Sequence, residues 1–119
     1  MDRYKAHQNL AKKAILFASK RFPKELRLYD RHVGLLYTKN GTPMMINRKG
    51  MADCWGYYAC HSILVHIEIE FKSGNARQTK EQKQWQEHIE SFGGCYILCR
   101  NESEIVEKLE LYLKDRKLI

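Results

Sequence analysis

The 119-residue sequence lacks any apolar run approaching the roughly 18 residues that a membrane-spanning helix requires. Its first residues, MDRYK, also lack the apolar core of a secretory signal peptide. No internal repeat, low-complexity run or linker interrupts the chain. We therefore expect a soluble, cytoplasmic protein that forms a single domain over residues 1–119 and does not associate with a membrane.

The cysteines lack the spacing of the common zinc sites. The four cysteines, Cys54, Cys60, Cys95 and Cys99, form no C-x-x-C pair. In a reducing compartment we expect them to be buried thiols and not disulfides. The alternative is a zinc site, because Cys95 and Cys99 can share a strand face and His61 adjoins Cys60, but no clean set of four ligands emerges.

Acidic residues are outnumbered by basic ones. The chain has 14 Asp and Glu against 21 Lys and Arg, for a net charge of +7 and a pI of about 9.3. The positive excess is spread along the whole chain and is not gathered into a tail. Such a charge favours a polyanionic partner, although it is also compatible with a small protein that merely stays soluble.

Hydrophobic periodicity predicts a chain order of helix, three or four strands, helix, strand, helix. The first helix spans 2–22, the second runs from 79 to about 92, and the third spans 103–114. The longest strand spans 63–72, and 57–62 is expected to be the turn that leads into it. Shorter strands are expected at 31–38, which forms a hairpin with 44–46, and at 52–56 and 95–100.

The long strand Ile63–Lys72 alternates strictly between apolar and mostly polar side chains. Glu70 and Lys72 lie together at its end on the polar face, where Asp53 from a neighbouring strand is expected to join them. On an exposed face such a pair would be an ordinary solvated ion pair. A strand between two amphipathic helices is expected to be covered, however, and a covered acidic group beside a lysine indicates function.

These residues suit metal-assisted hydrolysis of a phosphodiester bond. Mg²⁺ prefers oxygen ligands and keeps several waters, so Asp53, Glu70 and the backbone carbonyl of Phe71 form a plausible open site. Lys72 is expected to orient the attacking water or to offset charge on the phosphoryl group. Gln82, in the first turn of the second helix, is expected to hold a water or a phosphate oxygen. Its alternative role is that of an ordinary capping-box residue after Thr79.

Neighbouring residues receive structural assignments. His66 and Glu68 share the face of Glu70 and are expected to be polar neighbours or helix contacts, not metal ligands. Trp85 is expected in the core, and it shares the inner face of the second helix with Gln82, Ile89 and Phe92. Lys49 and Arg77, which flank the site in sequence, are candidates for binding phosphates, and Arg48 and Lys80 are further candidates.

Four ordered segments resemble the VRR-NUC (virus-type replication-repair nuclease) branch of the PD-(D/E)XK nuclease superfamily. They are GMAD (50–53), EIEFK with the following SG (68–74), TKEQKQW (79–85) and GGCY (93–96). The resemblance spans about two-thirds of the chain. It implies an α/β, restriction-endonuclease-like αβββαβ core with a mixed central sheet flanked by helices. It also implies Mg²⁺ or Mn²⁺ dependence and cleavage of structured or branched DNA.

The resemblance also assigns roles to individual residues. Asp53 and Glu70 match the metal ligands, Lys72 the catalytic lysine and Gln82 the additional motif glutamine. Members that consist of little beyond this domain are similar to Holliday-junction resolvases and act as homodimers, and a phage or prophage origin would suit such a compact copy.

One departure from the family concerns the first helix, which in such nucleases often contributes a glutamate near the metal. Here its inner face offers His7 and Gln8, with Asp2 the only acid nearby, so a weaker or differently completed metal site is expected.

Two other functions are compatible with these residues. One is a non-catalytic nucleic-acid-binding module of the same fold, which would bind without a metal and release no product. The other is an RNA-directed nuclease, because the D…E-x-K arrangement does not select the sugar.

Overall fold

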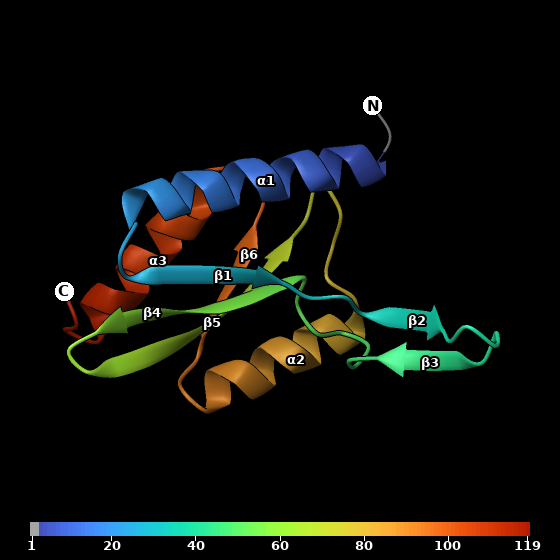
Figure 1. Cartoon of the computed structure of the whole chain (residues 1–119). Helices are drawn as coiled ribbons and strands as arrows, with labels where there is room; N and C mark the ends of the chain where they lie inside the picture. The colour runs from blue at the N-terminus through green and yellow to red at the C-terminus, as the bar shows by residue number, and fades with distance from the viewer. Residues whose placement is uncertain (1–2) are drawn as a thin grey trace.

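Periodic apolar residues from the first and third helices and four strands form one core against a mixed sheet, and the second helix lies on the other side of that sheet (Figure 1). The structure is a computed structural model that describes the backbone of residues 3–119 and the side chains of residues 5–119. The elements in chain order are α1 (Arg3–Arg21), β1 (Leu26–Asp30), β2 (Gly34–Tyr37), β3 (Pro43–Ile46), β4 (Cys54–Cys60), β5 (Ile63–Phe71), α2 (Lys80–Ser91), β6 (Cys95–Cys99) and α3 (Glu104–Asp115).

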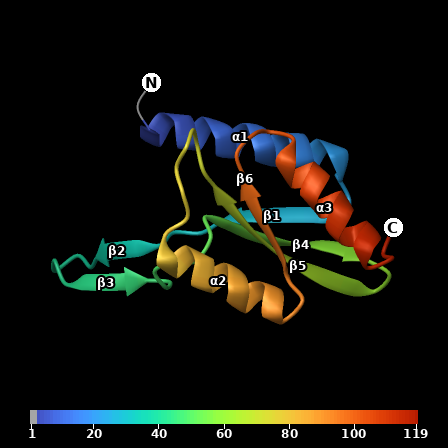
Figure 2. The same ribbon diagram turned by 180° about the vertical axis from the view of Figure 1, so that it is seen from behind.

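The main sheet has the strand order β1-β4-β5-β6. The pairs β1–β4 and β4–β5 are antiparallel, whereas β6 runs parallel to β5. A parallel neighbour needs a crossover connection, and α2 provides it. Figures 1 and 2 show α1 and α3 on one face of the sheet and α2 on the other. The predicted α/β class, with a mixed sheet between helices, is confirmed.

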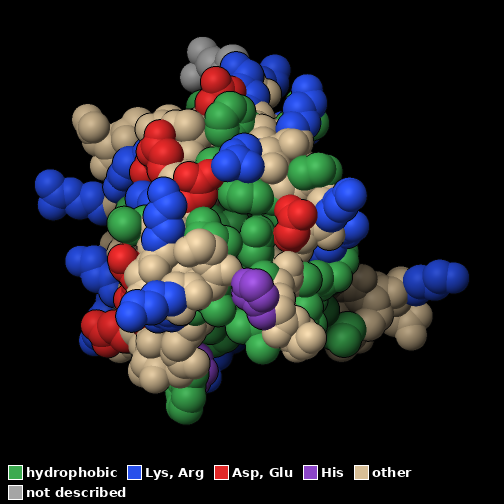
Figure 3. Space-filling view, turned by 90° about the vertical axis from the view of Figure 1, so that its left-hand side faces the viewer, with side chains coloured by type: hydrophobic (Ala, Val, Ile, Leu, Met, Phe, Trp, Pro, Cys, Tyr) green, Lys and Arg blue, Asp and Glu red, His purple; other side chains and the backbone are tan. Residues whose placement is uncertain are grey.

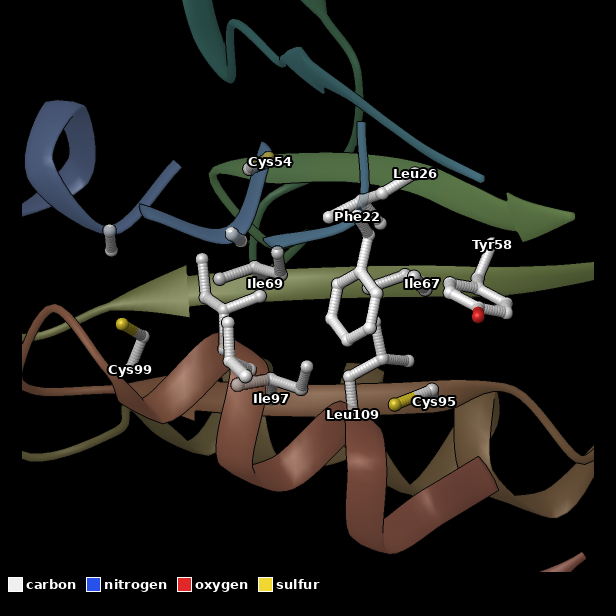
Figure 4. Packing of buried hydrophobic residues seen from close by; sticks show 14 of the residues in the cluster. Phe22, Leu26, Cys54, Tyr58, Ile67, Ile69, Cys95, Ile97, Cys99 and Leu109 are labelled. Carbon is white, nitrogen blue, oxygen red and sulfur yellow. The ribbon is translucent and has the colours of Figure 1, made fainter. Parts of the chain in front are cut away.

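The hydrocarbon core lies between the sheet and the pair α1 and α3. Helix α1 contributes residues at helical spacing, and β5 contributes its odd-numbered residues from Val65 to Phe71, of which Figure 4 labels Ile67 and Ile69. Burial of these side chains is the main source of the stability of the fold. The fully buried members with the largest side chains are Ile67, Ile69, Ile97, Ile105, Leu109 and Leu113.

The opposite face of β5 is also covered, but by a polar layer. From Glu68 onward every residue of β5 is buried, and on this side of the sheet lies α2, whose Trp85 donates to Glu68. Glu68 and Glu70 are both 0% exposed. The expectation that the acidic face of the long strand is covered is therefore confirmed.

Two predictions for the segments around β4 are wrong. Residues 57–60, expected to be part of a turn, extend β4, and the turn contains only His61 and Ser62, with φ of 49° and 66°. Positive φ at both positions fits the two-residue turns that match the twist of a hairpin. Strand β1 was not predicted, since five residues after Pro23 carry little periodic signal. It packs so closely on β4 that a Cβ on Gly56 would lie 1.9 Å from the Arg27 carbonyl oxygen.

The predicted hairpin exists, but it lies outside the main sheet. The strand expected over 31–38 shortens to β2, which pairs with β3 in a separate two-stranded sheet. Figures 1 and 2 show this pair projecting beyond the body of the molecule.

Several surface features complete the fold. On the face shown in Figure 3, basic and acidic side chains are interspersed with hydrophobic ones, so the positive excess is not concentrated there.

All four cysteines are free thiols, and three of them are buried while Cys60 is partly exposed. Within residues 3–119, no helix combines the length and apolar character needed to cross a membrane.

Candidate active site

Asp53 lies where α1, β4 and β5 converge, directly before the first residue of β4. Its Oδ2 accepts a hydrogen bond of 2.9 Å from the backbone N–H of Phe71. The same oxygen lies 3.2 Å from Nε2 of His7, on the inner face of α1. The carboxylate is still 40% exposed, so it is held in place from two elements while remaining open to solvent.

Glu70 lies beside Asp53, because the register pairs Cys54 with Ile69 one position away from each. Both oxygens of Glu70 are buried, and neither has a hydrogen-bond partner among the described residues. Burial raises the pKa of the Glu70 carboxyl, and the charge of Asp53 adds to the rise while Lys72 opposes it. A buried carboxylate without hydrogen bonds is costly, so its presence calls for an explanation.

Lys72 follows the last residue of β5 and is partly buried. Its backbone N–H donates to the Cys99 carbonyl at 3.0 Å, which continues the pairing with β6 and fixes the start of the following loop. A cavity of about 290 Å³ opens at this point, and Asp53 and Lys72 both line it. Its lining residues are His7, Asp53, Phe71, Lys72, Ser73, Ala76 and Arg77.

The structure gives Gln82 a capping role. Its Oε1 accepts the N–H of Thr79 at 2.8 Å, and its own N–H donates to the Thr79 hydroxyl at 3.1 Å, which completes a capping box. The glutamine that approaches the buried carboxylate is Gln78, and with the Tyr96 hydroxyl it acts to lower the pKa of Glu70, although neither group makes a hydrogen bond of normal geometry to it. The Nε2 of Gln78 donates to Gln86 at 3.0 Å and to the Tyr96 hydroxyl at 3.3 Å.

Sequence reasoning missed Gln78 as a site residue, because it falls in a polar loop without periodicity. The only sequence signal for it is its position immediately before the helix cap. The inner face expected for the second helix is also partly wrong, because Phe92 is 82% exposed. Helix α2 ends at Ser91, and Phe92 caps it while its ring packs on His88.

Glu68 is fully hydrogen-bonded, in contrast to Glu70. Arg31 donates to both of its oxygens, with 2.8 Å between Nη2 and Oε2. The indole N–H of Trp85 donates to Oε1 at 2.8 Å, and His66 Nε2 lies 2.7 Å from Oε2. Burial acts to raise the pKa of Glu68, but these partners outweigh it and hold the pKa below its usual value. Trp85 is accordingly a partly buried bridge from α2 to β5 and not a core residue.

Three of the four basic residues named from the sequence line two cavities. Arg77 lines the cavity at Asp53. Arg48 and Lys49 line a second cavity of about 420 Å³ between the end of the hairpin segment and α2, and Lys49 lies 3.8 Å from the Glu81 carboxylate. Lys80 is exposed at the start of α2.

The donor set suits a hard cation with few protein ligands. Among the described residues, no three His, Cys, Asp or Glu side chains are grouped to bind a metal ion. Two neighbouring carboxylates remain, one of them buried without a hydrogen bond, and Mg²⁺ commonly binds through one or two carboxylates and water. From α1, Gln8 is exposed, and Asp2 lies outside the described residues.

Comparison with known proteins adds no further constraint on this site. Neither a scan against protein-family models nor a search of curated proteins found a match to the chain.

Proposed function

We propose that this protein is a metal-dependent endonuclease that hydrolyses phosphodiester bonds of structured or branched DNA. The observation that carries the proposal is the Glu70 carboxylate, which is completely buried without a hydrogen bond beside Asp53 and Lys72. A fold retains such a group against its desolvation cost when a ligand compensates for it, and a divalent cation compensates for a carboxylate best.

Asp53 and Glu70, with the Phe71 carbonyl, are the groups that would hold Mg²⁺ or Mn²⁺. When bound, the cation supplies charge neutralisation at the phosphoryl oxygens and lowers the pKa of water. The described contacts of Asp53 both use Oδ2, so Oδ1 is the oxygen that would be left to bind a cation. The Phe71 N–H and His7 fix the orientation of this carboxylate.

Lys72 supplies a positive charge to the same site. Its ammonium group lowers the pKa of Glu70 from a distance, and its side chain lines the cavity that also exposes Asp53. From this position it orients the attacking water or stabilises charge that builds on the phosphoryl group. Arg77, on the wall of the same cavity, contacts the phosphate backbone.

The order of elements supports a restriction-endonuclease-like core. When the projecting hairpin is set aside, the chain reads α1, β1, β4, β5, α2, β6, which is the αβββαβ order implied by the VRR-NUC resemblance. That resemblance also supports branched DNA as the substrate and a homodimer as the active form. The net charge of +7 is consistent with a nucleic-acid substrate.

The test is cleavage of a four-way junction, a splayed flap and a linear duplex in Mg²⁺, Mn²⁺ or EDTA. We expect metal-dependent cutting of a branched substrate, reduced about 100-fold or more in Glu70→Gln and in Lys72→Ala. Matched controls are Glu87→Gln and Lys83→Ala, which change exposed residues of α2. Circular dichroism checks that each variant is folded.

Three results would contradict the proposal in different ways. Metal-independent binding without any product would indicate a nucleic-acid-binding module. Preferential cutting of the RNA versions of these substrates would indicate an RNA-directed nuclease. Equal losses in the α2 controls would show that Glu70 and Lys72 have no special role.

A further inference from the structure

The β2–β3 ribbon, residues 34–46, exposes large apolar side chains on both of its faces. Leu35 pairs with Met45 and Leu36 pairs with Met44 across the ribbon, so one pair faces each side. The exposed fractions are 53% for Leu35 and 60% for Met45, and 45% and 51% for the other pair. An isolated two-stranded ribbon is only marginally stable in water, so this exposure indicates a partner.

The segment that carries the ribbon, residues 31–53, begins and ends at the candidate active site. The backbone N–H of Arg31 donates to the Asp53 carbonyl at 2.9 Å, and its guanidinium donates to the Ala52 carbonyl at 3.2 Å. These contacts join the two ends of the segment that contains the ribbon. Near its second end, Gly50 at φ 95° lies so close to α2 that a Cβ would be 2.6 Å from the Glu81 carbonyl oxygen. Figures 1 and 2 show the ribbon leaving the body near the start of α2.

The charge of this segment favours a polyanion as the partner. Residues 31–52 contain no Asp or Glu, whereas Lys39 lies at the tip and Arg48 and Lys49 lie at the base. A second copy docked ribbon to ribbon would bring Lys39 and Arg48 of both copies together, whereas Lys49 already has an acid beside it, Glu81 at 3.8 Å. A nucleic acid would instead neutralise them and release counterions.

We propose that the β2–β3 ribbon is a wedge that enters DNA at a branch point and unstacks the bases there. Leucine, methionine and proline are among the side chains that proteins insert between base steps, and the ribbon offers all three, including Pro43. The inference rests on the proposed nuclease function and deepens it. Because the segment that carries the ribbon begins and ends beside Asp53, the wedge would hold the branch point on the side of the molecule where the phosphate is cut.

The test uses a four-way junction with 2-aminopurine beside the branch point, in EDTA so that no strand is cut. The wild-type protein is expected to raise the 2-aminopurine fluorescence, because unstacking relieves its quenching. A variant with Leu35→Ser, Leu36→Ser, Met44→Ser and Met45→Ser is expected to lose this rise. It should also lose about tenfold in its preference for the junction over a linear duplex.

The control variant combines Leu16→Ser and Leu111→Ser, which change exposed apolar residues of α1 and α3. It should behave as wild type, and the ribbon variant should keep the wild-type oligomeric state in sedimentation. An unchanged fluorescence rise in the ribbon variant would overturn the wedge. So would a conversion from dimer to monomer, which would make the ribbon a contact between copies. A wild-type protein that opens the branch but cuts no substrate would refute the nuclease proposal and leave the wedge standing.

Discussion

Glu68 and Glu70 lie two residues apart on the same face of β5, and both are completely buried, yet their surroundings are opposite. Glu68 accepts hydrogen bonds from Arg31 and Trp85 and contacts His66. Glu70 has no hydrogen-bond partner that meets normal geometry among the described residues. Burial acts to raise both pKa values, but it is outweighed at Glu68 and prevails at Glu70.

The contrast separates a structural carboxylate from a candidate catalytic one. A charge with ideal partners fixes the elements that donate to it, which here are the segment after β1 and helix α2. A charge without partners destabilises the fold and is retained where activity requires it. Burial alone therefore does not identify a functional acid, whereas burial without hydrogen bonds does indicate one.

The largest effect is expected from removing Glu68. Glu68→Met leaves the Arg31 guanidinium, whose side chain is only 10% exposed, without its anion. Loss of one partner of a buried pair typically costs about 3–5 kcal/mol, so the free energy of unfolding should fall by that amount. Urea unfolding followed by circular dichroism measures the change, and Glu87→Met on the exposed face of α2 is the matched control.

The double variant Arg31→Met with Glu68→Met sharpens this prediction. Because no buried charge is left unpaired, it should be more stable than the sum of the two single losses implies. Strict additivity of the two losses would show that Arg31 and Glu68 are not coupled. It would contradict the structural role inferred for Glu68.

Replacing Glu70 is expected to raise the free energy of unfolding, whereas replacing Glu68 lowers it. In EDTA, Glu70→Gln removes a buried charge that lacks hydrogen bonds, so near neutral pH the variant should be more stable than wild type by about 1–2 kcal/mol. The folded-state pKa is raised, so the folded state binds more protons than the unfolded state between the two pKa values. Wild-type stability from this group therefore falls as the pH rises, and the advantage of the variant should shrink on acidification.

Urea unfolding of both proteins from about pH 8 down to about pH 4 covers this range. Glu68 contributes in the reverse direction, since its depressed pKa gives stability that is lost as the pH falls through the folded-state value. That contribution is common to both proteins and cancels in the comparison. A variant less stable than wild type at neutral pH would show that Glu70 is satisfied in solution.

The parts of the fold with strong periodicity were predictable from the sequence. The alternation of β5 and the spacing of the three helices gave those elements to within a few residues. Strand β1 was not predicted, since its five residues, LRLYD, are too few for a periodic signal. Strand β4 was predicted too short, because Gly56 suggests a break, whereas the glycine allows β1 to approach closely.

The candidate site was likewise predictable only where its residues lie on strands with a clear sequence pattern. Asp53, Glu70 and Lys72 were placed together from their positions on neighbouring strands, and the structure brings them to one end of the sheet. The partners of Glu68 were not predictable in detail, because Arg31 lies 37 positions away, after a strand that the sequence did not reveal. Local pattern thus locates groups on a strand, but only the tertiary structure decides which carboxylate is satisfied.

The smallest expected changes in the free energy of unfolding distinguish the role of Gln82 from that of Gln78. Gln82→Ala breaks one half of the capping box and should lower the free energy of unfolding by about 0.5–1 kcal/mol. The gain in stability from Glu70→Gln should be about the same whether residue 82 is glutamine or alanine. Gln78→Ala removes the amide that approaches Glu70, so it should change the gain in stability that Glu70→Gln produces. Double-mutant cycles with Glu70→Gln, measured by urea unfolding, test both statements. Strong coupling of Gln82 to Glu70 would contradict a purely capping role and would support Gln82 as a residue of the candidate active site.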